Sequence, residues 1–224
     1  LFPVLLAPLV LRHLLPDWRR AGVWAGCFAG VTAVCFLPPI LLYGWPGVWE
    51  PLRFQLSREP MAFTIYGPVL PMSLSANDLP ARAFRLGALV LTVGVLCLTR
   101  PDLAGVLRRG AVVLIVFIGL AVYFSPQWIL WLAPLCLPLT RGNRILVVLV
   151  VALDLVTYYT YPVWAGTVWA PFGAGGLEHA VYARFAILGG LVALLLWQEW
   201  RRAPQAAPAG TPIPVGRPGT AGQA

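Results

Sequence analysis

The chain has 224 residues, of which 59% are hydrophobic and only 11% are charged, and its mean hydropathy is +0.80. Soluble domains are about 45–50% apolar and about 25% charged, so this composition excludes an ordinary soluble protein and predicts an integral membrane protein. The net charge of +8 does not favour a nucleic-acid partner, because the arginines are scattered in short loops between apolar runs and form no stripe. We therefore expect an all-α fold, a polytopic transmembrane helical bundle.

The apolar runs predict about six full spans within residues 1–202, preceded by a shorter N-terminal helix. The run at 1–11 is too short to cross a bilayer, and we expect it to be the end of a helix in the C-terminal part of a larger protein. Pro38 and Pro39 should kink or end the first full span. Residues 203–224 are rich in Pro, Ala and Gly and should form a disordered cytoplasmic tail. The expected spans are 21–43, 86–99, 104–124, 129–139, 145–162 and 180–197.

The distribution of arginine predicts the topology. Loops that are short and basic should be cytoplasmic, whereas the corner at 125 and the loop 163–179, which contain no Arg, should be extracytoplasmic. Arg108 and Arg109 should snorkel to the cytoplasmic face. The loop at about 44–85 falls outside, although it is basic. The short basic loops are 12–20, 100–110, 141–144 and 198–202.

The loop at about 44–85, which we call the outer loop, contains several arginines although the positive-inside rule favours arginine in cytoplasmic loops. One interpretation is a loop that tolerates its charge, because long loops translocate despite it. The alternative is that the guanidinium groups bind phosphate, which they hold bidentately. A helix over 49–60 would place three polar side chains on or near one face: Arg53, Gln55 and Arg58.

Two apolar runs meet at a polar corner, Ser125-Pro126-Gln127-Trp128. Pro126 suits the first position of a new helix and Ser125 suits its N-cap, so Gln127 should lie at or just inside one membrane face. In one interpretation Gln127 satisfies backbone groups and Trp128 joins the interfacial aromatic belt. In the other, the amide and the indole line a cavity for a polar head group.

Two charged residues lie inside predicted spans, Asp154 and Arg184. An uncompensated Asp at the bilayer centre costs roughly 2.5–3.5 kcal/mol, so a partner is expected. We favour a structural ion pair between the two, and outward snorkelling of Arg184 is the alternative. The four cysteines fall in apolar runs without metal-binding spacing, so we predict no metal site and no cofactor.

The corner Ser125-Pro126-Gln127-Trp128, followed by Leu130-Trp131-Leu132 and Pro134, resembles a signature of bacterial polyprenol-phosphate-sugar-dependent membrane glycosyltransferases. These enzymes have the GT-C fold, and the likeness is strongest to the polyprenyl-phosphomannose-dependent mannosyltransferases, which usually have Tyr in place of Trp128. The opening run, with Phe2-Pro3 and Pro8, is similar to a family helix that ends in an arginine-rich cytoplasmic loop. The stretch from Phe54 to Arg58 is similar to the family's ectoloop pattern.

The resemblance implies transfer of a sugar, expected to be mannose, from a polyprenyl phosphate donor to a glycan or glycolipid acceptor at the extracytoplasmic face of the cell membrane. It implies that Arg53, Gln55 and Arg58 bind the donor phosphate, and that Gln127 and Trp128 line the sugar cavity. The family's catalytic base lies in an ectoloop upstream of these motifs, so no base is assigned, and we expect the present chain to be inactive alone. Two other hypotheses remain, a transporter or flippase of a lipid-linked or small polar substrate, and a non-catalytic membrane scaffold.

Overall fold

The computed structural model describes residues 2–15, 17–57, 64–66, 69–125, 127–164 and 174–202. Within these ranges the regular secondary structure is helical, apart from an isolated bridge between Tyr66 and Leu70. Among the described residues, four helices are long and apolar enough to cross a membrane. The all-helical prediction is therefore confirmed, and the helices are those of a membrane-associated protein. The predicted tail, 203–224, lies outside the described residues.

The helices follow the apolar runs of the sequence. The first half of the chain forms α1 Phe2–Leu14, α2 Trp18–Tyr43, α3 Pro46–Leu56, η1 Met72–Ser75, α4 Leu79–Cys97 and α5 Leu103–Leu120. The second half forms α6 Gln127–Leu130, α7 Ala133–Cys136, η2 Leu137–Leu139, α8 Arg144–Trp164 and α9 Ala174–Arg202. The predicted outer loop thus contains α3, η1 and the beginning of α4.

Three aspartates fix the beginnings of long helices. Asp17 accepts from the Arg20 backbone N–H, Asp78 from that of Ala81, and Asp102 from that of Gly105 at 2.6 Å. A carboxylate at this position satisfies a backbone donor that has no partner within the helix, and it interacts favourably with the helix dipole. These local signals set where α2, α4 and α5 start.

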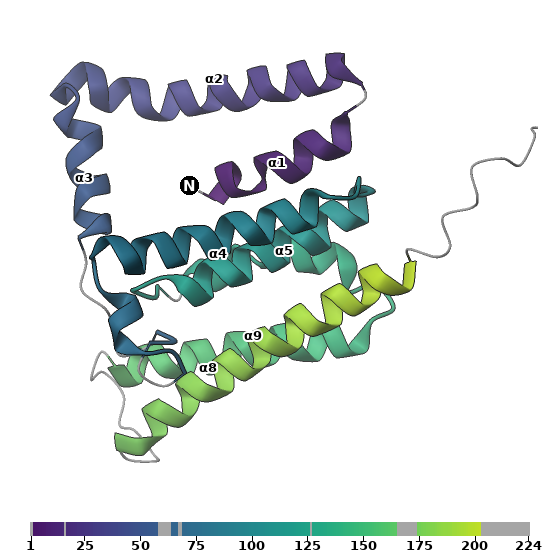
Figure 1. Cartoon of the computed structure of the whole chain (residues 1–224). Helices are drawn as coiled ribbons and strands as arrows, with labels where there is room; N and C mark the ends of the chain where they lie inside the picture. The colour runs from purple at the N-terminus through teal and green to yellow at the C-terminus, as the bar shows by residue number, and fades with distance from the viewer. Residues whose placement is uncertain are drawn as a thin grey trace, which may run out of the picture.

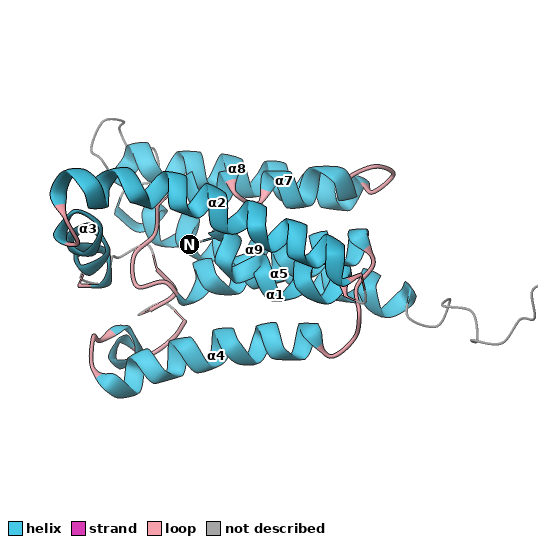
Figure 2. Ribbon diagram, turned by 90° about the horizontal axis from the view of Figure 1, so that it is seen from above, coloured by secondary structure: helices cyan, strands magenta, loops and turns pink. Residues whose placement is uncertain are grey.

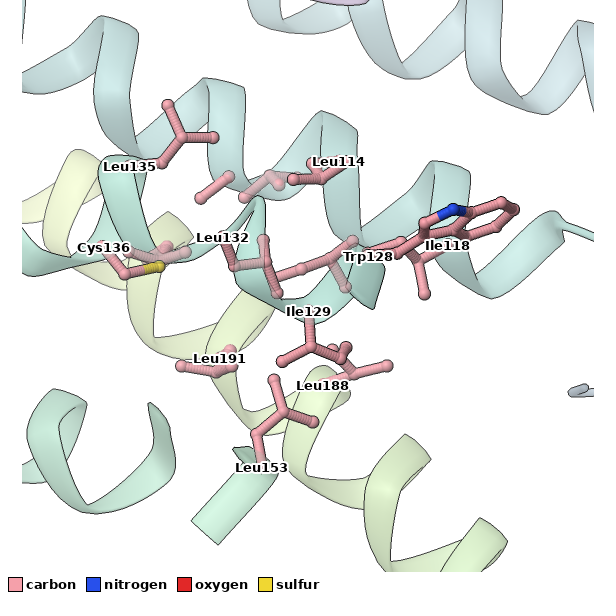
Figure 3. Packing of buried hydrophobic residues seen from close by; sticks show 14 of the residues in the cluster. Leu114, Ile118, Trp128, Ile129, Leu132, Leu135, Cys136, Leu153, Leu188 and Leu191 are labelled. Atoms are coloured by element: carbon pink, nitrogen blue, oxygen red, sulfur yellow. The ribbon is translucent and has the colours of Figure 1, made fainter. Parts of the chain in front are cut away.

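The bundle is layered around α5. Helix α5 packs against α9, α1, α4 and α7, and α8 packs along α9. Figure 2 shows α4 on one side of α5, and α7 and α8 on the other. The apolar core lies between α5, the short α6 and α7, and the α8–α9 pair, where Leu114, Ile129, Leu153 and Leu191 are buried (Figure 3). Inside a bilayer such packing stabilises the bundle through van der Waals contact.

Helix α2 lies at the edge of the bundle and packs mainly against α1 and α3 (Figure 1). The sequence predicted that Pro38 and Pro39 kink or end this helix. Helix α2 does not end at the two prolines but continues to Tyr43. It ends at Gly44, whose φ of 69° lies in the left-handed region that favours glycine. Gly47 then fits closely, because a Cβ there would lie 2.7 Å from the Cβ of Tyr43.

The predicted span at 129–139 is wrong as a continuous helix. The chain here forms three short pieces, α6, α7 and η2. Pro134 stands in the first turn of α7 and Pro138 in that of η2. Each proline lacks the N–H that a continuing helix needs, so the backbone hydrogen bonding is interrupted at both. This segment follows the polar corner and forms part of the core as a broken helix.

Candidate functional site

The polar corner is built around a buried tryptophan. After α5 ends at Leu120, the chain turns, and Trp128 is only 6% exposed in the core. Its ring contacts Tyr123 edge-on at 4.9 Å between centroids and stacks on Trp131 at 5.9 Å. Gln127, in contrast, is exposed. The two residues expected to line one cavity therefore lie in different environments, and the indole of Trp128 holds the corner against the bundle (Figure 3).

Helix α9 brings a guanidinium group to this corner. Arg184 is completely buried, and its Cζ lies 3.9 Å from the ring centroid of Phe124 and 5.2 Å from that of Phe185. A cation over an aromatic face is stabilised by about 0.5–2 kcal/mol, the larger value applying where the pair is desolvated. The positive charge of Arg184 thus lies beside Phe124, next to the polar corner.

Two threonines of α8 are buried, and one of them, Thr157, lies near the level of Arg184. Thr157 and Thr160 are each 3% exposed. Gly190 and Leu149 face each other where α8 packs against α9, because a Cβ at Gly190 would lie 4.0 Å from the side chain of Leu149. This pair gives the relative level of residues on the two helices. Thr157 lies about 12 Å beyond Leu149 along α8 and Arg184 about 9 Å before Gly190 along α9, so both lie within one turn of the same level.

The hydroxyl groups of these threonines differ. Thr160 Oγ1 donates to the Val156 carbonyl oxygen at 2.7 Å. Thr157 Oγ1 is buried and has no hydrogen-bond partner within the part of the chain that the structure describes. A buried hydroxyl without a partner is costly, which makes Thr157 a candidate donor to a ligand. We call Phe124, Trp128, Thr157 and Arg184 the corner site.

The predicted Asp154–Arg184 ion pair is not found among the ion pairs that join described residues. Asp154 is exposed, whereas Arg184 is buried. The inward positions of α8 include Leu153 and Thr157, and a residue one step from Leu153 is rotated by about 100° around the helix. Asp154 therefore points away from the core, and the described residues give no support for a direct pair between Asp154 and Arg184.

The loop before α4 is tied down over the end of α5. Tyr66 is 2% exposed, and its hydroxyl donates to the Leu120 carbonyl oxygen at 2.6 Å, which satisfies an acceptor at the helix end. Arg85 donates through Nη1 to the carbonyl oxygens of Leu74 and Ala76. Burial raises the pKa of Tyr66, and the positive charge of Arg85 opposes this shift, so the phenol remains a neutral donor at physiological pH.

The other predicted phosphate ligands are only partly described. Arg53 is exposed on α3, with its Nη1 3.6 Å from Glu50 Oε1. Helix α3 ends at Leu56, so the helical face expected to include Arg58 is interrupted before that residue. The side chain of Gln55 and the whole of Arg58 lie outside the described residues.

At the opposite end of the bundle, sequence reasoning missed a buried ion-pair network. Glu199 accepts from Arg108 Nε at 2.7 Å and from Arg109 Nη2 at 2.6 Å. Arg109 Nη1 also donates to the carbonyl oxygens of Leu96 and Thr99, at the end of α4. The arginines are 2% and 7% exposed, so the expectation that they snorkel to solvent is wrong. We call Arg108, Arg109 and Glu199 the Glu199 clamp, which joins α4, α5 and α9.

Comparisons of the chain with protein-family models, with curated proteins and with solved structures gave no match. The geometry of the corner site and the resemblance of its motif are therefore the grounds for a functional proposal.

Proposed function

We propose that this chain is part of an integral membrane glycosyltransferase that moves a sugar, expected to be mannose, from a polyprenyl phosphate donor to a glycan or glycolipid acceptor. The observation that carries the proposal is the fully buried Arg184, stacked on Phe124 at the corner. Ionisable residues within spans are costly, and they commonly mark a substrate path or site. A guanidinium group is the side chain best suited to bind phosphate.

The corner site offers the chemistry that such a reaction needs at the leaving group. When the bond between the anomeric carbon and the phosphate oxygen breaks, negative charge develops on the phosphate. Arg184 stabilises that charge in a site of low dielectric, and Thr157 donates a hydrogen bond to a phosphate oxygen. The acceptor hydroxyl forms the new bond to the anomeric carbon, and its proton passes to a general base that we do not assign.

The remaining predicted residues have secondary parts in this proposal. Trp128 positions the corner through its ring contacts with Tyr123 and Trp131. Gln127 is exposed next to it, where an amide can contact a sugar hydroxyl. Helix α3, which carries Arg53, lies at the same end of the bundle as the corner (Figure 1), where Arg53 would attract the donor phosphate; the resemblance gives Gln55 and Arg58 a part in the same binding.

A transporter or flippase is the second candidate, because a buried arginine in a span also suits a path for an anionic substrate. The two candidates differ in their products. A glycosyltransferase yields a glycosylated acceptor and free polyprenyl phosphate, whereas a flippase moves an unchanged lipid across the bilayer.

The test is transfer from radiolabelled polyprenyl-phosphomannose by membranes that contain the natural full-length protein. We expect Arg184→Gln to lower transfer about 100-fold or more, which is the usual effect of removing one donor to developing negative charge. Arg82→Gln is the matched control, because Arg82 is exposed at the beginning of α4, and it should leave transfer unchanged. Wild-type turnover by a folded Arg184→Gln protein would overturn the proposal, and lipid movement without transfer would favour the flippase.

A further inference from the structure

The end of the bundle that holds the Glu199 clamp also collects exposed arginines. The topology brings the last turn of α1, the first turn of α2, the α4–α5 turn, the η2–α8 turn and the last turn of α9 to this end (Figures 1 and 2). The exposed arginines there are Arg12, Arg19, Arg20, Arg100, Arg141, Arg144, Arg201 and Arg202. We call this surface the arginine end.

Few acids balance this charge. Within the described residues of the arginine end, the exposed acids are Asp17 and Asp102. Asp17 is already paired with Arg20 at 3.0 Å and caps α2. Glu199 is engaged in the clamp with two buried arginines. The surface is therefore strongly positive and extends over the ends of several helices.

Exposed tryptophans accompany the arginines. Trp18 and Trp200 are each 72% exposed, and Trp197 is 45% exposed. The guanidinium group of Arg201 stacks on Trp197, with Cζ 3.9 Å from the ring centroid, and that of Arg19 lies 5.7 Å from Trp18. Tryptophan at the ends of apolar helices is typical of the headgroup layer of a bilayer. This pairing favours a lipid surface over a nucleic acid or a soluble acidic protein.

We propose that the arginine end binds the headgroups of anionic phospholipids and retains them at the protein surface in preference to zwitterionic ones. Each basic residue close to an anionic leaflet favours binding about fivefold, and the effect falls off within a Debye length. The tryptophans fix the depth of the helix ends, so that the guanidinium groups lie at the level of the phosphates. This surface is separate from the corner site and does not depend on the proposed function.

The test is quenching of tryptophan fluorescence by brominated lipid, with the whole chain in vesicles of equal parts phosphatidylglycerol and phosphatidylcholine. Bromine carried by phosphatidylglycerol should quench about twofold more than bromine carried by phosphatidylcholine, because the anionic lipid is enriched at the arginine end. Changing six exposed arginines to Gln should abolish the difference. The six are Arg19, Arg20, Arg141, Arg144, Arg201 and Arg202.

Arg82→Gln is the control, because Arg82 is exposed at the other end of the bundle, and it should keep the preference. Raising the salt concentration should weaken the preference of the wild-type chain, which tests the proposal even where the six-site variant fails to fold. Equal quenching by the two lipids in the wild type would overturn the proposal, as would a preference that resists salt, survives the six changes, or is lost in the control.

Discussion

The Glu199 clamp and the corner site lie at opposite ends of the same bundle, and both contain buried arginine. The groups that surround the arginines differ. In the clamp, Arg109 meets the carboxylate of Glu199 and two backbone carbonyl oxygens within hydrogen-bonding distance. At the corner, the Cζ of Arg184 lies over the ring of Phe124, and the residue is near the level of Thr157. The clamp arginines join helices through oxygens of described residues, whereas the described surroundings of Arg184 are aromatic rings, and we propose that an anionic ligand binds there.

The largest effect is expected from removing the acid of the clamp. Glu199→Ala removes the carboxylate that contacts both buried guanidinium groups and leaves Arg108 with only the more distant Asp102, at 3.6 Å; breaking a buried pair typically costs about 3–5 kcal/mol. We expect the unfolding free energy in detergent, measured by denaturant titration, to fall by that amount. Glu199→Asp should retain part of it. A loss of less than about 1 kcal/mol would show that the clamp is not a structural junction.

The next largest effect is a change in melting temperature on ligand binding, which should distinguish the corner site from the Glu199 clamp. Polyprenyl phosphate should raise the melting temperature of the wild-type chain, because a ligand that binds only the folded state stabilises it. We expect this increase to vanish in Arg184→Gln and to persist in Arg109→Gln, although Arg109→Gln melts at a lower temperature in the absence of ligand. Thermal unfolding with and without the lipid measures both. An equal increase in the two variants would remove the distinction between the ends.

A smaller effect is expected at the tie between the loop and α5. Tyr66→Phe removes the hydrogen bond to the Leu120 carbonyl oxygen and should cost about 1 kcal/mol. Hydrogen exchange of the amides around residue 66 should become faster, while that of α8 and α9 stays the same. Unchanged exchange in this loop would mean that other contacts hold it over the corner.

The smallest effect is expected at Asp154, although it lies within a predicted span. Because its side chain is exposed and points away from Arg184, Asp154→Asn removes no ion pair and should not lower the unfolding free energy by more than about 0.5 kcal/mol. Denaturant titration against the wild type measures the difference. A loss near 3 kcal/mol would restore the ion pair that the sequence suggested.

The sequence predicted the long helices well because long apolar runs are a local signal. It also placed Ser125 to Trp128 at a corner, since proline interrupts helices in a recognisable way. The break at 127–139 was underestimated, although Pro134 and Pro138 are visible in the sequence. The local sequence pattern thus predicted where the helices lie better than it predicted whether each helix is continuous.

Pairings between distant residues were the part that the sequence did not reveal. Arg109 and Glu199 are 90 positions apart, and only the packing of α5 against α9 brings them together. The sequence marks Arg184 as unusual, but pairing it with Asp154 would need both residues to face each other across α8 and α9, and the period of 3.6 residues turns Asp154 away from the inward face of α8. The inward series formed by Leu146, Leu153, Thr157 and Thr160 already excludes Asp154.

The most direct measurement of the central claim is equilibrium binding of polyprenyl phosphate to the wild-type chain, to Arg184→Gln and to the control Arg82→Gln. If Arg184 binds the phosphate through charge-assisted hydrogen bonds, its replacement should weaken binding by about tenfold or more, while the control binds as the wild type does. Equal affinity in all three proteins would contradict the assignment of Arg184 as the anion-binding residue of this site.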